Sequence, residues 1–140
     1  MEALKDIIVK YDVDSAKNLV TEDDLNLLES ELSFVFGKQL QEYILNFGYL
    51  GLGSIEFYGI NSIQKEKSDL ISQTKYLHKY FSPSIGYVAV ENRGEGDYAL
   101  VDKDDNVYLL RTENGQELIN LRKKFFDYIK ERFSEISNKS

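Results

Sequence analysis

The sequence contains no cysteine and a single histidine, His78. The absence of thiols excludes a disulfide framework, a thiolate nucleophile and a cysteine-ligated zinc site. One histidine cannot build a histidine-rich metal site, and a catalytic triad would have to use this one residue. We interpret His78 as a structural histidine within a helix. We therefore expect no cofactor, no metal and no enzymatic activity.

Long apolar runs are also missing. No stretch approaches the ~20 apolar residues that cross a bilayer. Residues 1–12 lack the basic region followed by an apolar run that marks a signal peptide. The lack of cysteine suits a reducing compartment. We expect a cytoplasmic protein that has no membrane partner.

Acidic side chains outnumber basic ones by 24 to 17, which gives a formal net charge of −7. A chain this acidic repels phosphate backbones, so direct binding of nucleic acid is disfavoured. The same charge attracts a basic protein and speeds the encounter with it. Solubility alone explains the charge equally well. The charge therefore permits a basic partner without identifying one.

The strongest structural pattern lies in residues 86–111. Three runs rich in β-branched and aromatic residues are separated by two short stretches of turn residues. Runs of this length predict antiparallel strands joined by tight turns. Val88 and Val90 share one face of the first strand, and Tyr87 and Ala89 share the other. Because both faces are apolar, we expect helices to cover one face and part of the second.

Helical spacing of apolar residues predicts the other elements. Thr21 and Asp24 predict a capping box at a helix start, Gly48 a helix end and Pro83 another. The expected helices are 2–11, 21–33, 38–47, 65–81 and a long C-terminal helix that follows a capping box of Asn114 and Glu117. Residues 54–60 are expected to form a strand, residues 49–53 a glycine-rich connection, and residues 12–18 a loop.

These elements predict an α+β fold with a largely antiparallel mixed sheet and helices packed against it. We expect one domain over residues 1–140, with its core in about residues 20–135. N-terminal helices and the long C-terminal helix would flank the strands.

Two candidate sites find little support. Asp102, Asp104, Asn106 and Glu113 match ligand positions of an EF-hand calcium loop. However, Val107 stands where the sharp turn of that loop needs glycine, so an ordinary hairpin turn is favoured. The paired carboxylates near the first predicted hairpin could do acid–base work. Carboxylates beside an exposed turn are more often simply solvated.

Three further stretches have the order and spacing of one known family. They are an acidic helix leading into Phe36-Gly37 and an aromatic-bearing helix that ends at Gly48, the strand 55–60, and the strand and turn sequence 88–108. Together they resemble the SUKH superfamily, also named SMI1/KNR4, over about residues 20–135. The chain differs at Phe36-Gly37, where many members have Leu-Pro, and at Phe47-Gly48, where Asn-Gly is usual.

The resemblance implies a mixed sheet with packed helices and no general catalytic machinery. Many bacterial members look like immunity proteins, which neutralise a toxin, often a nuclease, by binding it. We expect such a protein here, with a cognate toxin that carries a basic nuclease domain as its partner. The alternative is a non-catalytic regulatory or scaffold module that binds another protein. The candidate partner-binding residues combine negative charge with aromatic rings: Tyr49, Glu56, Tyr58, Glu91, Glu95 and Asp97.

Overall fold

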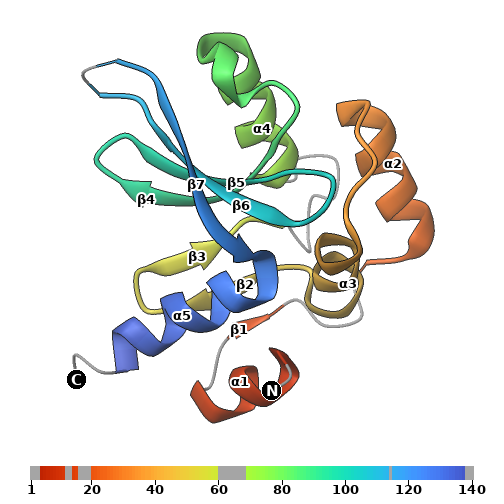
Figure 1. Cartoon of the computed structure of the whole chain (residues 1–140). Coiled ribbons are helices and arrows are strands. Elements are labelled where there is room, and N and C mark those ends of the chain that lie inside the picture. The colour runs from red at the N-terminus through yellow and green to blue at the C-terminus, as the bar shows by residue number, and fades with distance from the viewer. Residues whose placement is uncertain (1–3, 12–13, 16–19, 60–68, 114, 138–140) are drawn as a thin grey trace.

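The structure, a computed structural model, describes residues 4–11, 14–15, 20–59, 69–113 and 115–137 (Figure 1). Helices and strands both contribute, which confirms the expected α+β class. In chain order the elements are α1 (Leu4–Tyr11), β1 (Asp14–Ser15), α2 (Glu22–Leu32), α3 (Lys38–Phe47), β2 (Leu50–Leu52), β3 (Ile55–Phe57), α4 (Asp69–Tyr80), the short 3-10 helix η2 (Ser82–Ser84), β4 (Val88–Gly94), β5 (Asp97–Val101), β6 (Asn106–Arg111), β7 (Glu117–Lys124) and α5 (Phe125–Ser137).

The strands of the described residues form one sheet in sequence order, from β1 to β7. Each strand pairs antiparallel with the next. The turn between β4 and β5 has Glu95 and Gly96 at its centre, with φ of 54° and 81°. Positive φ at both central residues matches the right-handed twist of the paired strands. The predicted hairpins are therefore confirmed, and no described pair of strands is parallel.

Local residues set the helix ends as the sequence predicts. At the start of α2, the Thr21 hydroxyl accepts a hydrogen bond from the backbone N–H of Asp24 at 3.2 Å. The Asp24 carboxylate accepts in return from the N–H of Thr21 at 2.9 Å. α3 spans the predicted residues and ends at Gly48, whose φ of 71° favours glycine.

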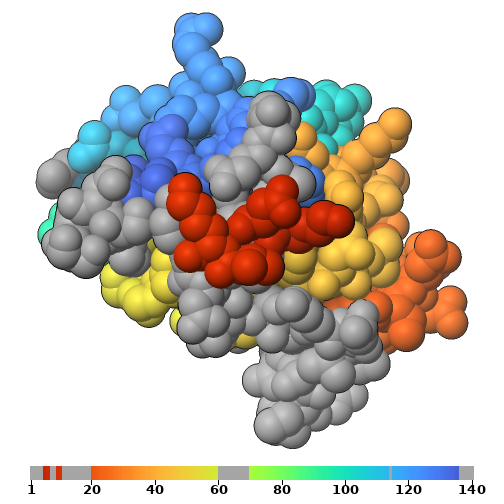
Figure 2. Space-filling model, turned by 90° about the horizontal axis from the view of Figure 1, so that it is seen from below, coloured from red at the N-terminus to blue at the C-terminus, as the bar shows by residue number. Residues whose placement is uncertain are grey.

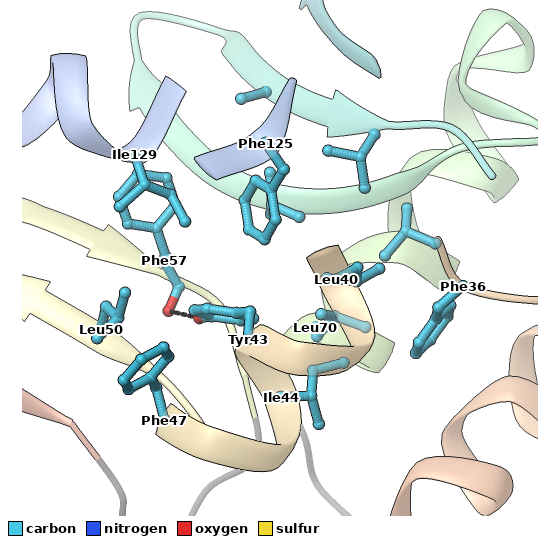
Figure 3. Packing of buried hydrophobic residues seen from close by; sticks show 14 of the residues in the cluster. Phe36, Leu40, Tyr43, Ile44, Phe47, Leu50, Phe57, Leu70, Phe125 and Ile129 are labelled. Atoms are coloured by element: carbon cyan, nitrogen blue, oxygen red, sulfur yellow. Dashed lines mark hydrogen bonds between the residues drawn. The ribbon is translucent and has the colours of Figure 1, made fainter. Parts of the chain in front are cut away.

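The main core lies between the sheet and the helices α3 and α5. Tyr43 of α3 is fully buried, and its hydroxyl donates to the backbone oxygen of Phe57 at 3.0 Å (Figure 3). Phe57 packs edge-to-face on Phe133 of α5, with ring centroids 5.5 Å apart. Phe125, at the start of α5, packs on Tyr43 at 5.2 Å. These rings join α3, β3 and α5.

A second, smaller core lies on the opposite face of the sheet. Leu77 of α4 packs there on Ala89, Leu100 and Leu110 of β4, β5 and β6. Val88 and Val90 belong to the main core instead. The two predicted faces of β4 are therefore confirmed, and α4 covers part of the second face.

The C-terminal helix is shorter than predicted. Residues 117–124, expected to be helical, form β7, and α5 begins at Phe125. Leu118 and Leu121 fit helical spacing, but β7 pairs with β6 and places Leu118 opposite Leu110. Pairing with a neighbouring strand thus overrides the local pattern. Asn114 of the expected capping box lies outside the described residues, and Glu117 is the first residue of β7.

Other boundaries also differ from prediction. The expected connection 49–53 contains β2, which pairs with β3 through Gly51 opposite Glu56. The expected loop 12–18 contains the two-residue strand β1. α4 is described from Asp69, because the earlier part of its expected range lies outside the described residues. Figure 2 shows α1 on the surface, next to α5. None of the described helices combines the length and apolar character needed to cross a membrane.

Candidate protein-binding surface

Glu91, one of the predicted partner-binding residues, is buried in the structure. The register of β4 and β5 explains why. Ala89 pairs with Leu100 and Glu91 with Ala99, so Val90 is an extra residue in a β-bulge. A bulge re-aims the side chain that follows it. Glu91 therefore points towards α5 instead of sharing the face of Ala89, and the expectation of a solvated carboxylate was wrong.

Side chains of α5 satisfy the buried Glu91 carboxylate. The Arg132 guanidinium donates to it from Nε at 2.9 Å and from a terminal nitrogen at 2.7 Å. The Tyr128 hydroxyl donates to its other oxygen at 2.5 Å. Burial and the charge of Glu91 raise the pKa of Tyr128, so its hydroxyl keeps the proton. This network fixes α5 on the sheet and gives Glu91 a structural role.

The other predicted residues lie at two places on the sheet, around β2 and β3 and at the β4–β5 turn, and they differ in exposure. Glu56 on β3 and Glu95 in the β4–β5 turn are exposed, whereas Tyr49, Tyr58 and Asp97 are partly buried. Tyr58 packs against both core clusters. The β3–β4 pairing sets Phe57 opposite Glu91, and the turn begins four residues further along β4. At ~3.3 Å per residue, roughly 13 Å of strand separates Glu95 from that pair.

A surface made of residues outside the predicted set lies on the second face of the sheet. Tyr76 and Tyr80 of α4 are 45% and 55% exposed, and their ring centroids lie 5.1 Å apart. Phe81 packs on Tyr76 at 6.3 Å. Tyr98 and Leu118 of the sheet pack on the core beneath. These five residues are called the tyrosine face below.

Tyr76 and Tyr98 bring the helix and the sheet together in this face. Burial is the main cause that raises the pKa of the Tyr98 hydroxyl, and the charge of a deprotonated Tyr76 adds to it. The two phenols are therefore electrostatic neighbours. A sequence signal was present, because Tyr76 and Tyr80 are spaced i, i+4 away from the stripe of α4 that contains Leu70 and Leu77.

In the sheet beneath the tyrosine face, two rows of residues that lie opposite one another on neighbouring strands contain no charged side chain. Cross-strand partners share a face. One row contains Asn92, Tyr98, Leu110 and Leu118, and the next contains Ala89, Leu100, Tyr108 and Asn120. The opposite face is different: one of its rows contains Gly94, Asp97, Arg111 and Glu117. The tyrosine face thus combines exposed aromatic rings on α4 with two uncharged rows of the sheet beneath them.

A comparison with protein-family models gives one decisive match. The model SUKH_5, described as SMI1-KNR4 cell-wall, matches residues 2–134. The chain belongs to the SUKH superfamily. SUKH proteins are generally non-catalytic, and the family is consistent with a function like that of immunity proteins. No curated protein matches the chain.

The departure from the SUKH pattern at Gly37 has a structural reason. Gly37 is the N-cap of α3 and has no side chain to cap the helix. Asp105, in the β5–β6 turn, supplies the cap, accepting from the N–H groups of Gln39 and Leu40 at 2.9 and 3.0 Å. A Cβ at Gly37 would lie 2.4 Å from the Asp105 carboxylate. Because Gly37 has no side chain, Asp105 can approach from a distant part of this SUKH chain and cap α3.

The β5–β6 turn is an ordinary polar turn held by hydrogen bonds within it, as its Asp/Asn-rich sequence predicted. The Asp102 carboxylate accepts from the N–H groups of Asp104 and Asn106 at 2.9 and 3.0 Å. These bonds and the Asn106 side chain outweigh partial burial and lower the pKa of Asp102. His78 contacts the backbone oxygen of Tyr87 at 2.8 Å, which fits its structural interpretation. The described residues contain no cluster of side chains suited to a metal ion.

α2 is the most acidic element of this SUKH protein. It carries five acidic residues and no basic residue in its eleven positions. Glu31 forms an ion pair with Lys75 of α4 at 2.7 Å. Leu27 of α2 and Val35, in the connection to α3, are 61% and 74% exposed. Figure 1 shows α2 at the edge of the molecule. Glu22, Asp23 and Glu31 of this helix are exposed.

Proposed function

We propose that this SUKH protein is an immunity protein that binds a cognate bacterial toxin, a nuclease, and neutralises it by non-covalent binding. The family match over residues 2–134 carries the proposal. The net charge of −7 supports it. A nuclease holds nucleic acid on a positive surface, and an acidic protein can cover that surface. Inhibition then needs only a stable complex and no catalytic step.

Charge would act mainly on the encounter. The acids of α2, together with exposed Glu56 and Glu95, create a negative field that attracts a basic partner. Exposed charges of this kind raise the association rate more than they lower the dissociation rate. The partly buried Tyr49, Tyr58 and Asp97 offer little surface, so in this proposal they lie at the margin of the contact.

The description of the matched family refers to the cell wall. This favours a second candidate function, a regulatory or scaffold module that binds a protein of cell-wall metabolism. Both candidates need a protein-binding surface and no catalysis. They differ in whether the bound partner has a toxic activity that the complex suppresses.

The test is affinity capture of the tagged full-length chain from lysate of the cells that encode it. Bound proteins are identified by mass spectrometry and assayed for nuclease activity before and after the chain is removed. The proposal expects one tightly bound basic protein whose nuclease activity returns on removal. A tightly bound partner with no activity to suppress would contradict it and favour the regulatory candidate.

A further inference from the structure

The tyrosine face has the composition of the centre of a protein interface. Interface centres are depleted of charged residues and enriched in tyrosine, and their strongest contacts are often buried aromatic anchors. Here Tyr76 and Tyr80 are exposed on a helix. The helix fixes the position of their rings, and the rings stay accessible to a partner. The cross-strand row below them, which contains Tyr98 and Leu118, has no charged side chain.

Among the described elements, fewer helices pack on this side of the sheet than on the other. α3 and α5 contribute to the main core on one side, whereas α4 is the helix that packs on the second core. Tyr98 and Leu118 remain partly exposed beside it. Further burial of this aromatic and apolar surface would be favourable, at about 25 cal/mol per Å² of apolar area. A partner could bury this surface without any change in the fold of this chain.

The rings also indicate the chemistry of the partner. The Lys79 ammonium lies 5.3 Å from the centroid of the Tyr80 ring, so a cation of this chain already occupies one face of that ring. Arginine and lysine side chains of a second protein can stack on the ring faces that stay exposed, those of Tyr76 above all. A second copy of this chain is a poor occupant, because each copy carries a net charge of −7 and repels the other.

From these observations we infer that the tyrosine face is the docking surface for the toxin, and that arginine or lysine side chains of the toxin stack on Tyr76 and Tyr80. This inference rests on the proposed function. It assigns the anchoring contacts to α4 and the sheet, and leaves the acidic residues of α2 and the hairpin turn to steer the encounter.

The test uses the toxin captured by the wild-type chain, once its activity has been shown to be suppressed. Isothermal titration calorimetry measures its Kd for the wild type and for Tyr76→Ala/Tyr80→Ala. We expect an increase of about 30-fold in Kd, as for the loss of interface hot spots. Leu27→Ala/Val35→Ala removes exposed apolar side chains elsewhere and is the matched control, with a change of less than about 3-fold.

A second variant separates binding from folding. Tyr76→Phe/Tyr80→Phe keeps both rings and should bind within about 3-fold of wild type, since stacking uses the ring faces. Circular dichroism melting of each variant checks the fold. Wild-type affinity in a folded Tyr76→Ala/Tyr80→Ala variant would overturn the docking surface while leaving the immunity function intact.

Two other outcomes are also decisive. If the wild-type chain captures no toxic protein, the proposed function fails and the inference fails with it. If sedimentation shows a wild-type dimer that the Tyr76→Ala/Tyr80→Ala variant cannot form, the occupant is a second copy and the inference about a basic toxin is wrong.

Discussion

Glu91 in β4 and Arg132 in α5 form a buried ion pair with two short hydrogen bonds to one carboxylate oxygen, at 2.7 and 2.9 Å. The Glu91 side chain is 1% exposed and that of Arg132 is 15% exposed. Burial alone would lower the pKa of Arg132, but the hydrogen bond and charge of Glu91 outweigh it and raise that pKa. The Arg132 guanidinium therefore stays protonated in its buried position.

Removing one partner of this pair should be costly. Glu91→Ala leaves the Arg132 guanidinium without its main acceptor and should reduce the free energy of unfolding by about 3–5 kcal/mol. Glu91→Leu/Arg132→Met, which removes both charges, should be much closer to wild type. Urea denaturation measures both. Glu135→Ala, which breaks the exposed contact of Arg132 at 2.9 Å, is the control and should cost at most about 1 kcal/mol. Equal losses in all three variants would contradict a buried pair.

The cap that Asp105 places on α3 should couple this residue to Gly37. Asp105→Ala removes two hydrogen bonds to the helix N-terminus and should cost about 1–2 kcal/mol. Asp105→Asn should cost less, since asparagine keeps one acceptor and tolerates the φ of 66° at this position.

Gly37→Ala should be worse in wild type than in the Asp105→Ala background, because its Cβ collides with the carboxylate. A double-mutant cycle in urea should give a coupling of about 1 kcal/mol or more. Strictly additive costs would mean that Asp105 does not cap α3.

The lowered pKa of Asp102 predicts an acid-sensitive contribution to stability. The folded chain keeps this carboxylate charged at pH values where the unfolded chain, with its ordinary value of 3.8, takes up a proton. Its contribution is therefore present above about pH 4 and is lost as the pH falls towards the folded-state pKa.

Asp102→Asn should cost about 1–3 kcal/mol at pH 7, and the gap to wild type should shrink as the pH falls towards 2. Asp104→Asn, in the same turn but exposed, is the matched control and should change stability by less than about 0.5 kcal/mol. A gap that is independent of pH would show that Asp102 contributes through packing alone.

Two buried tyrosines predict a loss of stability at alkaline pH. Burial raises the pKa of Tyr43 and of Tyr128 above the ordinary value of 10.0. Above pH 10 the unfolded chain therefore releases protons that the folded chain still holds. Each group removes about 1.4 kcal/mol per pH unit in this range. Above pH 10 the free energy of unfolding of Tyr43→Phe/Tyr128→Phe should fall less steeply with pH than that of wild type. Below pH 9 the two proteins should show the same dependence on pH. Identical slopes above pH 10 would contradict the burial of these hydroxyls.

The exposed carboxylates predict a kinetic effect on partner binding. Glu56→Lys and Glu95→Lys, each tested alone against the captured toxin, should slow association about 3-fold at low salt and leave dissociation nearly unchanged. The effect should fade at high salt, because exposed charges are screened. Glu42→Lys, an exposed reversal on α3, controls for net charge. If the same slowing occurs in Glu42→Lys, the effect belongs to total charge and not to these two sites.

The sequence predicted the structure correctly where the residues of one short segment determine it. Thr21 and Asp24 predicted the start of α2, and Gly48 predicted the end of α3, because each signal is a local hydrogen bond or a local backbone angle. Alternation likewise predicted that Val88 and Ala89 would lie on opposite faces of the sheet.

Predictions from the sequence were wrong or missing where contacts between segments far apart in the chain determine the structure. Gln39 of α3, not a local capping box, caps the start of α5 by accepting from the N–H of Phe126 at 2.8 Å. Pairing with β6 made residues 117–124 a strand despite their helical spacing. The bulge at Val90 directs the Glu91 side chain into the core, so Glu91 is not part of the candidate surface. The spacing of Tyr76 and Tyr80 on α4 was visible in the sequence, but no local pattern shows that the fold brings Tyr76 close to Tyr98 of the sheet.

The most direct test of the central claim is a titration of the captured toxin with the purified chain, with nuclease activity measured at each ratio. The account predicts a linear loss of activity that is complete near one chain per toxin, and full recovery when the complex is separated. Undiminished nuclease activity in a saturated complex would contradict the immunity function.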